Sequence, residues 1–427
     1  MKKKFTASLG AALLLLLSAT IFVYFVHPAP TRAAAPGSNA PYGITITGSQ
    51  FASTSAGSDF TNNLHVTWTR IQIPMCAMFP IGNTGCKNPP ITNYNPADPN
   101  NYDWTTFDQD LMQAQANGLL VDFPLQNAPN GSYNGNLFLD STCSHPTAYV
   151  FQQYAKALLI HVQSLLAQQI IAQGVLQAIE IGNEDWSFSA HGLSCENDAN
   201  VYAPIVEAVA STLRNYDTFM IPNPLIGSFG YTHFGLANDP NEPSARNAHT
   251  FWTTFFSYRD PRKPGDLGPG KLLDYVNFHY YHNNVDPDTV IPPTRGSIYP
   301  YGQDSFAGIY NEILQDAQVL KVVNHSKRPM PIWVTETGWA LTDCNQTSAT
   351  VTPSNQSLYE QKMLDEARQS NATIVRGRGS VTHLFLFSAD EYTTGCGDNG
   401  MDIFDHGIPQ LAGMMLPGYI QNHPTWP

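Results

Sequence analysis

Short apolar runs alternate with longer helix-compatible stretches along the chain from residue 41 onward. Apolar runs of this length are typical of buried strands, and their alternation with helices favours βα units around a parallel sheet. The candidate strands are Tyr42–Thr47, Val66–Ile73, Leu119–Leu125, Ala178–Gly182, Pro224–Ser228, Tyr275–Tyr281, Ile332–Thr335 and His383–Ser388. Eight such strands predict one (β/α)₈ TIM barrel, an α/β fold, over residues 41–427. Its chemistry is expected at the carboxyl ends of the strands.

The connecting stretches show helical periodicity. Apolar residues recur three and four positions apart in Tyr154–Ala172 and in Tyr202–Leu213. Two later helices are expected over Ile309–Val323 and Tyr359–Ala367. Charged residues make up only 13% of the chain, whereas there are 31 Gly and 32 Pro residues. This composition indicates many turns and long loops between the regular elements.

The N-terminal segment has the form of an export signal. Three lysines, Lys2 to Lys4, precede an uncharged stretch from Phe5 to Val26, and Ala33-Ala34-Ala35 offers a cleavage site. The stretch is long for a cleaved signal, so an uncleaved membrane anchor is the alternative. We therefore expect residues 1–35 to lie outside the fold. The protein is expected to be secreted or extracellular, with membrane contact only through such an anchor.

Six cysteines follow this segment, and an even number in an exported chain favours three disulfides. Each cysteine comes soon after a candidate strand, so all fall in loops on the same face of the barrel. Six cysteines allow about 15 connectivities. Their placement favours Cys76–Cys86 within the second loop, Cys143–Cys195 between the third and fourth loops, and Cys344–Cys396 between the seventh and eighth. The spacing contains no Cys-x-x-Cys pair, which argues against a zinc site, and neither a metal nor a cofactor is expected.

Two glutamates stand where apolar runs end. One lies in Ile181-Gly182-Asn183-Glu184 and the other in Thr335-Glu336-Thr337-Gly338-Trp339. A single glutamate in such a place is most often a solvated loop residue. Two of them at the ends of strands on one barrel face suit the cleavage of a glycosidic bond. That reaction needs one carboxyl group to protonate the leaving oxygen and another to attack the anomeric carbon or activate water.

With these motifs in view, the chain resembles the clan A glycoside hydrolases, which are retaining (β/α)₈ glycosidases. Asn183-Glu184 is similar to the clan's fourth-strand pair, which implies that Glu184 is the acid/base. Thr335-Glu336 is similar to its seventh-strand motif, which implies that Glu336 is the nucleophile. Arg70 matches the clan's second-strand arginine, and His279-Tyr280-Tyr281 matches its sixth-strand His-x-Tyr pattern. The resemblance does not resolve the family within the clan.

The resemblance gives each supporting residue an expected role. Asn183 would hydrogen-bond the sugar 2-OH, although capping the following helix is the alternative. Tyr281 and Arg70 would hold the nucleophile in its ionised form. His279 would contact the acid/base or the substrate, with a buried structural histidine as the alternative. Glu180 shares the strand parity of Glu184 and is expected one layer deeper, as a partner for inward-facing Arg or His side chains.

Aromatic side chains near the strand ends could stack on sugar rings, with core packing as the alternative for each. The candidates are Trp186, Trp339 and Phe387. Phe387 ends the eighth strand, where several families of the clan place a tryptophan. The sugar platform at the cleavage point is therefore assigned to Phe387 as a substitute.

The net charge of −13 argues against a nucleic-acid partner, because the electrostatic interaction between two negatively charged molecules would be repulsive. A neutral, β-linked polysaccharide or oligosaccharide suits it better. The expected activity is retaining hydrolysis by a monomer, with the carboxyl carbons of the two glutamates about 5 to 5.5 Å apart. The alternatives are a transglycosylase, an arabinofuranosidase-like exo-enzyme, and a catalytically silent glycan-binding protein of the cell surface.

Overall fold

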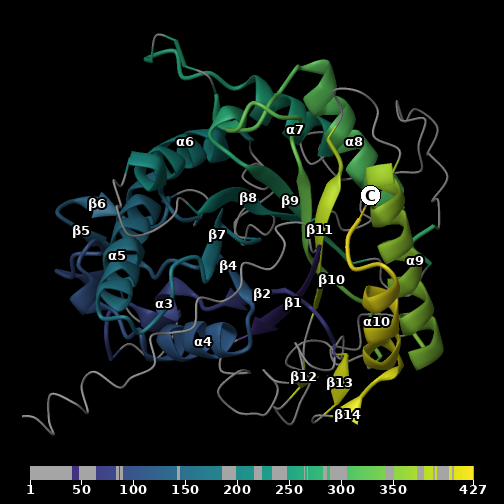
Figure 1. Ribbon diagram of the computed structural model, residues 1–427. Helices are drawn as coiled ribbons and strands as arrows, with labels where there is room; N and C mark the ends of the chain where they lie inside the picture. The colour runs from purple at the N-terminus through teal and green to yellow at the C-terminus, as the bar shows by residue number, and fades with distance from the viewer. Residues whose placement is uncertain are drawn as a thin grey trace, which may run out of the picture.

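The computed structural model (Figure 1) describes residues 41–47, 64–82, 86, 90–141, 145–184, 199–215, 224–232, 248–263, 265–266, 268–281, 286–288, 305–341, 351–372, 379–387, 390–391, 403–405 and 408–426. The candidate signal segment, residues 1–35, lies outside this part of the chain. Among the described residues, no helix has the length and apolar character needed to cross a bilayer.

Eight parallel strands close into a barrel, which confirms the fold predicted from the sequence (Figure 1). The first strand pairs with both the second and the last, so this sheet has no free edge. The barrel strands are β1 (Tyr42–Thr47), β2 (Trp68–Gln72), β4 (Leu120–Leu125), β7 (Leu176–Ile181), β8 (Leu225–Thr232), β9 (Tyr275–Tyr280), β10 (Ile332–Thr337) and β11 (Val381–Phe387).

The helices surround the barrel (Figure 1). The longer ones are α4 (Thr105–Ala116), α5 (Ala148–Ala167), α6 (Ala199–Asn215), α7 (Ala248–Ser257), α8 (Phe306–Val319), α9 (Pro353–Ala372) and α10 (Leu411–Asn422). Short elements in the connections are α3 (Met75–Met78), η1 (Pro99–Asn101) and η4 (Pro269–Lys271). Two small sheets consist of β3 (Ile91–Thr92), β5 (Gly131–Tyr133) and β6 (Asn136–Leu137), and of β12 (Asp390–Glu391), β13 (Phe404–Asp405) and β14 (Ile408–Pro409).

The ends of α5 differ from the sequence prediction for local reasons. The helix begins earlier because the Thr147 hydroxyl accepts a hydrogen bond from the Val150 amide at 3.3 Å. It ends earlier because Gln169 has a positive φ of 58°, which a right-handed helix does not allow. Strand boundaries also shift, and β8 is the largest case: it continues through Gly230 to Thr232 instead of ending at Ser228.

The amino-terminal half of the barrel interior is filled by aromatic rings. Tyr275 stacks on Trp333 at 3.9 Å between ring centroids, and Trp68 meets Trp333 edge-on at 5.0 Å. His383 and Phe385 complete the cluster from β11. Because this layer closes the floor of the barrel, polar groups above it can be buried without an open channel beneath them.

One disulfide lies in the described part of the chain. Cys76, in α3, is bonded to Cys86 with a Cα–Cα distance of 4.8 Å, which confirms this pairing. The other four cysteines, Cys143, Cys195, Cys344 and Cys396, lie outside the described residues, so their proposed pairing remains a prediction.

Candidate active site

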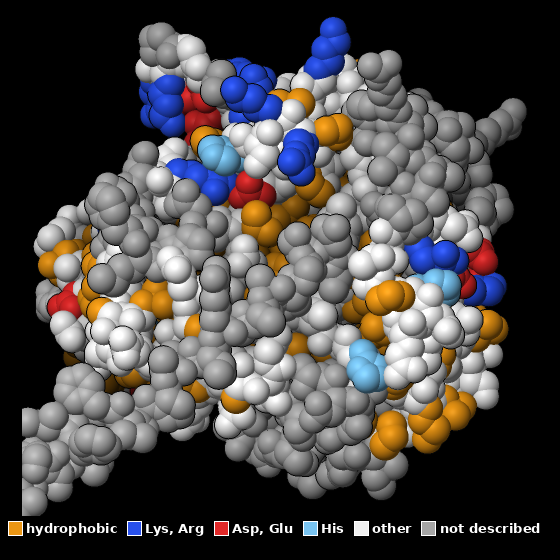
Figure 2. Space-filling model, in the orientation of Figure 1, with side chains coloured by type: hydrophobic (Ala, Val, Ile, Leu, Met, Phe, Trp, Pro, Cys, Tyr) orange, Lys and Arg blue, Asp and Glu red, His pale blue; other side chains and the backbone are white. Residues whose placement is uncertain are grey.

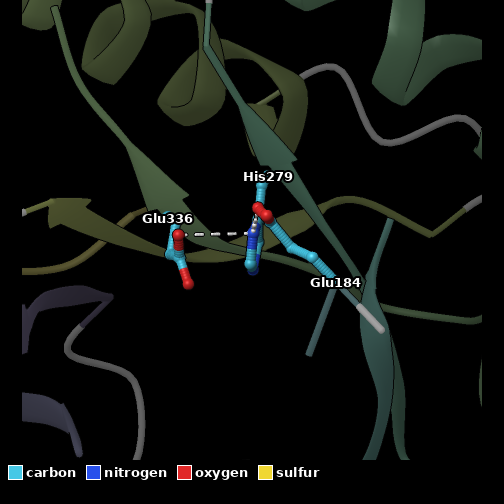
Figure 3. Close-up of side chains that lie close together, drawn as sticks. All are labelled: Glu184, His279 and Glu336. Carbon is cyan, nitrogen blue, oxygen red and sulfur yellow. Dashed lines mark hydrogen bonds and ion pairs between the residues drawn. The ribbon is translucent and has the colours of Figure 1, made fainter. Parts of the chain in front are cut away.

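Glu336 lies at the carboxyl end of β10, and only 4% of it is exposed. Its side chain points toward Glu184 and His279 at the mouth of the barrel (Figure 3). Parallel strands deliver their last residues to one face, which explains how residues far apart in sequence meet here.

Three uncharged or cationic donors surround the Glu336 carboxylate. Arg70 Nη1 donates to Oε1 at 2.6 Å, and the Tyr281 hydroxyl donates to Oε2 at 2.5 Å. Gln72 Nε2 also donates to Oε1. Burial raises the pKa of Glu336 above its ordinary value, although Arg70 and the Tyr281 hydrogen bond act against that rise. Since all three donors need an acceptor, they favour the ionised form that a nucleophile requires.

Tyr281 remains a donor because burial, with help from the Glu336 and Glu184 charges, raises its pKa well above the usual value. Gln72 was not singled out from the sequence. The available signal was strand parity, because Gln72 follows Arg70 by two positions on β2 and therefore faces the same side of the sheet.

Arg70 is fully buried and joins the two glutamate-bearing strands. Its Nη2 donates to Glu180 Oε2 at 2.6 Å and to Asn183 Oδ1 at 2.8 Å, while Nη1 contacts Glu336. Burial lowers the pKa of Arg70, but Glu180 and Glu336 outweigh this effect and the pKa is raised overall. The guanidinium is thus a permanent positive charge beneath the site, and Glu180 is its partner.

Asp122 is a second buried acid of this layer, and it was absent from the sequence candidates. Its Oδ2 lies 3.9 Å from Arg70 Nε, and the Tyr275 hydroxyl donates to Oδ1 at 3.2 Å. Burial and the neighbouring Glu180 raise the pKa of Asp122 well above its ordinary range. The shift favours the protonated form of Asp122, which reduces the negative charge of this layer.

Glu184 follows β7 after a sharp turn. Gly182 has a φ of 100°, a conformation that favours glycine, and this turn presents Asn183 and Glu184 at the barrel mouth. About a fifth of the Glu184 side chain, 22%, is exposed. Its carboxyl group nevertheless lies deep in the mouth, and burial raises its pKa to about 7 against a smaller opposing effect of Arg70. A carboxyl group with this pKa can hold a proton near neutral pH and release it to a substrate.

His279 lies between the two carboxylates (Figure 3). Its Nδ1 is 2.6 Å from Glu184 Oε1 and 3.4 Å from Glu336 Oε2. Burial lowers the pKa of His279 to about 4, so the ring is neutral at neutral pH. The ring rests against the backbone of β8 at Gly230, where a β-carbon would overlap it.

The two glutamates and His279 form a tight group. One oxygen of each carboxylate and a nitrogen of the ring all lie within 4.8 Å of one another. Such a group is also a donor set of the kind that binds a divalent metal ion. The Arg70 guanidinium already supplies positive charge against Glu336, so we do not assign the group as metal ligands.

The aromatic candidates have different positions. Trp339 is only 1% exposed and packs edge-on against Tyr280 and Tyr359, at 6.2 and 5.7 Å. This corrects the expectation that Trp339 stacks on sugar, because its ring belongs to the core. Phe387 is partly exposed and meets the Tyr281 ring edge-on at 5.9 Å. Trp186 lies outside the described residues.

Comparisons with known proteins support the fold. No protein-family model matches the chain, and no curated protein sequence matches it. Among solved structures, a family 39 glycoside hydrolase from Bacteroides cellulosilyticus superposes with a TM-score of 0.56 at 13% identity. That alignment covers 90% of this chain and 64% of the other, so this chain spans less than two thirds of that protein.

Two further structures match over nearly their full lengths. An endo-1,4-β-D-mannanase from Thermotoga petrophila has a TM-score of 0.50 at 14% identity, covering 90% of this chain and 99% of that one. A fungal β-1,4-galactanase has a TM-score of 0.50 at 13% identity, covering 90% and 100%. This chain has the fold of these glycosidases. Identities this low bear on the fold and leave the reaction to be argued from the site.

Proposed function

We propose that the protein is a retaining glycoside hydrolase that cleaves β-linked bonds in a neutral glycan. The observation that carries the proposal is the pair formed by Glu184 and Glu336, whose nearest oxygens lie within 4.8 Å across the barrel mouth. Retaining enzymes hold their carboxyl groups about 5 to 5.5 Å apart, whereas inverting enzymes leave about 6.5 to 9.5 Å for a water molecule. A nearest-oxygen distance of at most 4.8 Å is compatible with the retaining separation, which the proposal adopts.

The different surroundings of the two acids support different roles. Glu336 receives hydrogen bonds from Arg70, Gln72 and Tyr281, which suits an ionised nucleophile. Glu184 has a pKa raised to about 7 by burial, which suits an acid that later acts as a base. General acid–base catalysis of this kind contributes roughly 10²–10⁴-fold to the rate.

In the first step, a Glu336 oxygen attacks the anomeric carbon. The bond to the leaving oxygen breaks as Glu184 gives that oxygen its proton. In the second step, the Glu184 carboxylate takes a proton from water, and the water oxygen attacks the same carbon. The bond to Glu336 then breaks, which restores both groups and leaves the configuration of the sugar unchanged.

The neighbouring residues support these steps in the proposal. Asn183 is held by Arg70 beside Glu184, where its amide could meet the sugar 2-OH. Phe387, beside Tyr281, is the proposed platform for the sugar at the cleavage point. The net charge of −13 suits a neutral glycan, and the N-terminal segment suits an exported enzyme that acts on extracellular material.

The proposal is tested by assaying the full chain on β-glucans, xylan, mannan, galactan and aryl β-glycosides. We expect turnover of at least one of them, and nuclear magnetic resonance of the first product should show a β-anomer. Glu336→Gln and Glu184→Gln are the matched controls and should lose turnover. A first product of α configuration would contradict the retaining assignment. Binding of a glycan without turnover would favour the silent glycan-binding protein, and transfer to a sugar acceptor instead of water would favour a transglycosylase.

A further inference from the structure

A chain of hydrogen bonds leads from His279 into the wall of the barrel. The Nε2 atom of His279 lies 3.1 Å from the Thr335 hydroxyl, which accepts a hydrogen bond from Asn277 Nδ2 at 3.1 Å. The Ser228 hydroxyl lies 2.8 Å from Asn277 Oδ1. All four side chains are fully buried, so their hydrogen bonds must be satisfied by each other and by the adjacent backbone.

The geometry fixes the direction of this chain. The Ser228 oxygen accepts the Asn277 backbone amide at 2.9 Å, which leaves the hydroxyl hydrogen to donate. Its nearer acceptor is Asn277 Oδ1, at 2.8 Å compared with 3.2 Å for the Phe229 carbonyl. With Oδ1 used as an acceptor, the Asn277 amide presents its NH₂ to Thr335. Thr335 then directs its own hydroxyl hydrogen to Nε2 of His279.

We propose that Ser228, Asn277 and Thr335 are positioning residues that fix neutral His279 as the Nδ1–H tautomer, which donates to Glu184 Oε1. With Oε1 occupied as an acceptor, the acidic proton of Glu184 is carried on Oε2, the oxygen left for the substrate. The tautomer assignment stands on the hydrogen bonds alone. Its consequence for proton delivery rests on the proposed function.

Irregular strand pairing at Ser228 and Thr335 supports the proposed hydrogen-bond arrangement. The register of β8 against β9 shifts around Ser228, and the register of β10 against β9 shifts at Thr335. Such irregularities re-aim a side chain relative to a regular strand. Here both occur at the hydroxyl residues of the chain, on the two strands that flank the strand carrying Asn277 and His279.

The charged groups that face His279 are Glu184 after β7, Glu180 on β7, Arg70 on β2 and Glu336 on β10. Tyr281 is the other titratable neighbour, with its ring centroid 6.4 Å away. Because burial lowers the pKa of His279 to about 4, the ring that these groups surround is neutral at pH 7. A neutral ring carries one proton, on either Nδ1 or Nε2. The hydrogen bonds of Ser228, Asn277 and Thr335 determine which nitrogen carries it.

The test uses the full-length protein with ¹⁵N-labelled histidine. Nitrogen chemical shifts distinguish a protonated from an unprotonated ring nitrogen, and Gly230→Ala can help to assign the His279 signals. In the wild type, Nδ1 should carry the proton and Nε2 should be unprotonated at pH 7. Ser228→Ala lets the Asn277 amide turn its Oδ1 toward Thr335, which then donates to that oxygen and can accept from Nε2, so the Nε2–H tautomer should become populated. Thr335→Ser keeps the hydroxyl and should keep the wild-type tautomer.

The second readout is the pH profile of kcat/KM on a substrate found for the enzyme. Ser228→Ala takes the Nδ1–H donor away from ionised Glu184, so the basic limb of the profile, which reports the Glu184 pKa, should move upward by half a pH unit or more. Thr335→Ser should keep the wild-type limb, which a merely structural role for the threonine would not require.

Two results would overturn the inference: an Nε2–H tautomer in the wild type, or a tautomer unchanged in Ser228→Ala. If Ser228→Ala does not fold, the wild-type spectrum decides the question. The spectra need no substrate. A protein with the expected tautomer but no glycosidase activity would therefore refute the proposed function while leaving the tautomer assignment in place.

Discussion

Glu184 and Glu336 lie close together at the barrel mouth, but their neighbours give them different environments. Glu336 is held by donors from three side chains, whereas Glu184 contacts a neutral histidine and keeps about a fifth of its surface exposed. Donors favour the charged form of a carboxyl group, and burial without them favours the neutral form. The proposed division into a nucleophile and an acid/base therefore rests on the residues around the pair.

Other buried acids make the stability of the protein depend on pH. Asp110 and Glu360 are fully buried, their oxygens find no hydrogen-bond partner among the described residues, and burial raises the pKa of each to about 8. The folded state therefore binds more protons than the unfolded state between about pH 4.5 and 8. Stability should fall as the pH rises through this window and level off above it.

Glu360→Gln tests this prediction, because the amide cannot ionise. Its free energy of unfolding relative to the wild type should increase from pH 5 to pH 9 by on the order of 1–4 kcal/mol. Urea denaturation at both pH values measures this difference. Equal changes in variant and wild type would mean that the carboxyl group of Glu360 titrates normally in the folded protein.

At the scale of the elements, two glycines of β8 let aromatic and imidazole rings from β9 pack directly against the β8 backbone. A β-carbon at Gly227 would overlap the Tyr275 ring, and one at Gly230 would overlap the His279 ring. The glycines therefore allow both Tyr275 of the aromatic floor and His279 of the candidate site to lie against the same strand. This explains why β8 runs through Gly230, a residue that a sequence pattern treats as the end of a strand.

Gly230→Ala should displace His279, lower the free energy of unfolding by about 1–3 kcal/mol and reduce activity at least tenfold. Gly418→Ala in α10 is the matched control, because nothing lies within 4 Å of the added carbon. The control should be neutral or slightly stabilising, since alanine favours a helix more than glycine does. Thermal unfolding and kcat/KM together check the pair, and a fully active Gly230→Ala protein would show that the ring can move without consequence.

The sequence predicts where the strands end, but it does not predict how the side chains at the barrel mouth pack against one another. Apolar runs locate β7 and β10, and the end of each run places Glu184 and Glu336 on one face. Parity along β2 predicts that Gln72 joins Arg70, yet parity alone does not say that its amide reaches Glu336. Trp339 follows a strand end as Glu184 does, but its ring is turned into the core by contacts with distant elements. Such contacts have no signal in the local sequence.

At the scale of the whole molecule, the packed aromatic core and the carboxyl groups of the candidate site occupy different layers of the barrel. The floor is closed by aromatic packing around Trp333, the middle layer is organised by Arg70, and the carboxyl groups gather at the mouth. On the outside, Figure 2 shows apolar side chains on the side of α9 and α10, where Leu358, Leu411 and Met414 are exposed. These three residues belong to the two outer helices α9 and α10.

The central claim assigns the nucleophile to Glu336 and the acid/base to Glu184. The most direct measurement is the configuration of the glycosyl azide that each truncated variant forms from an activated aryl β-glycoside. Glu336→Gly should be rescued by azide entering from the vacated face, which gives an α-glycosyl azide. Glu184→Ala should still form the glycosyl-enzyme with a good leaving group, and azide should then give the β-product. The reverse pattern would invert the two roles, and unchanged turnover in both variants would contradict the glycosidase account.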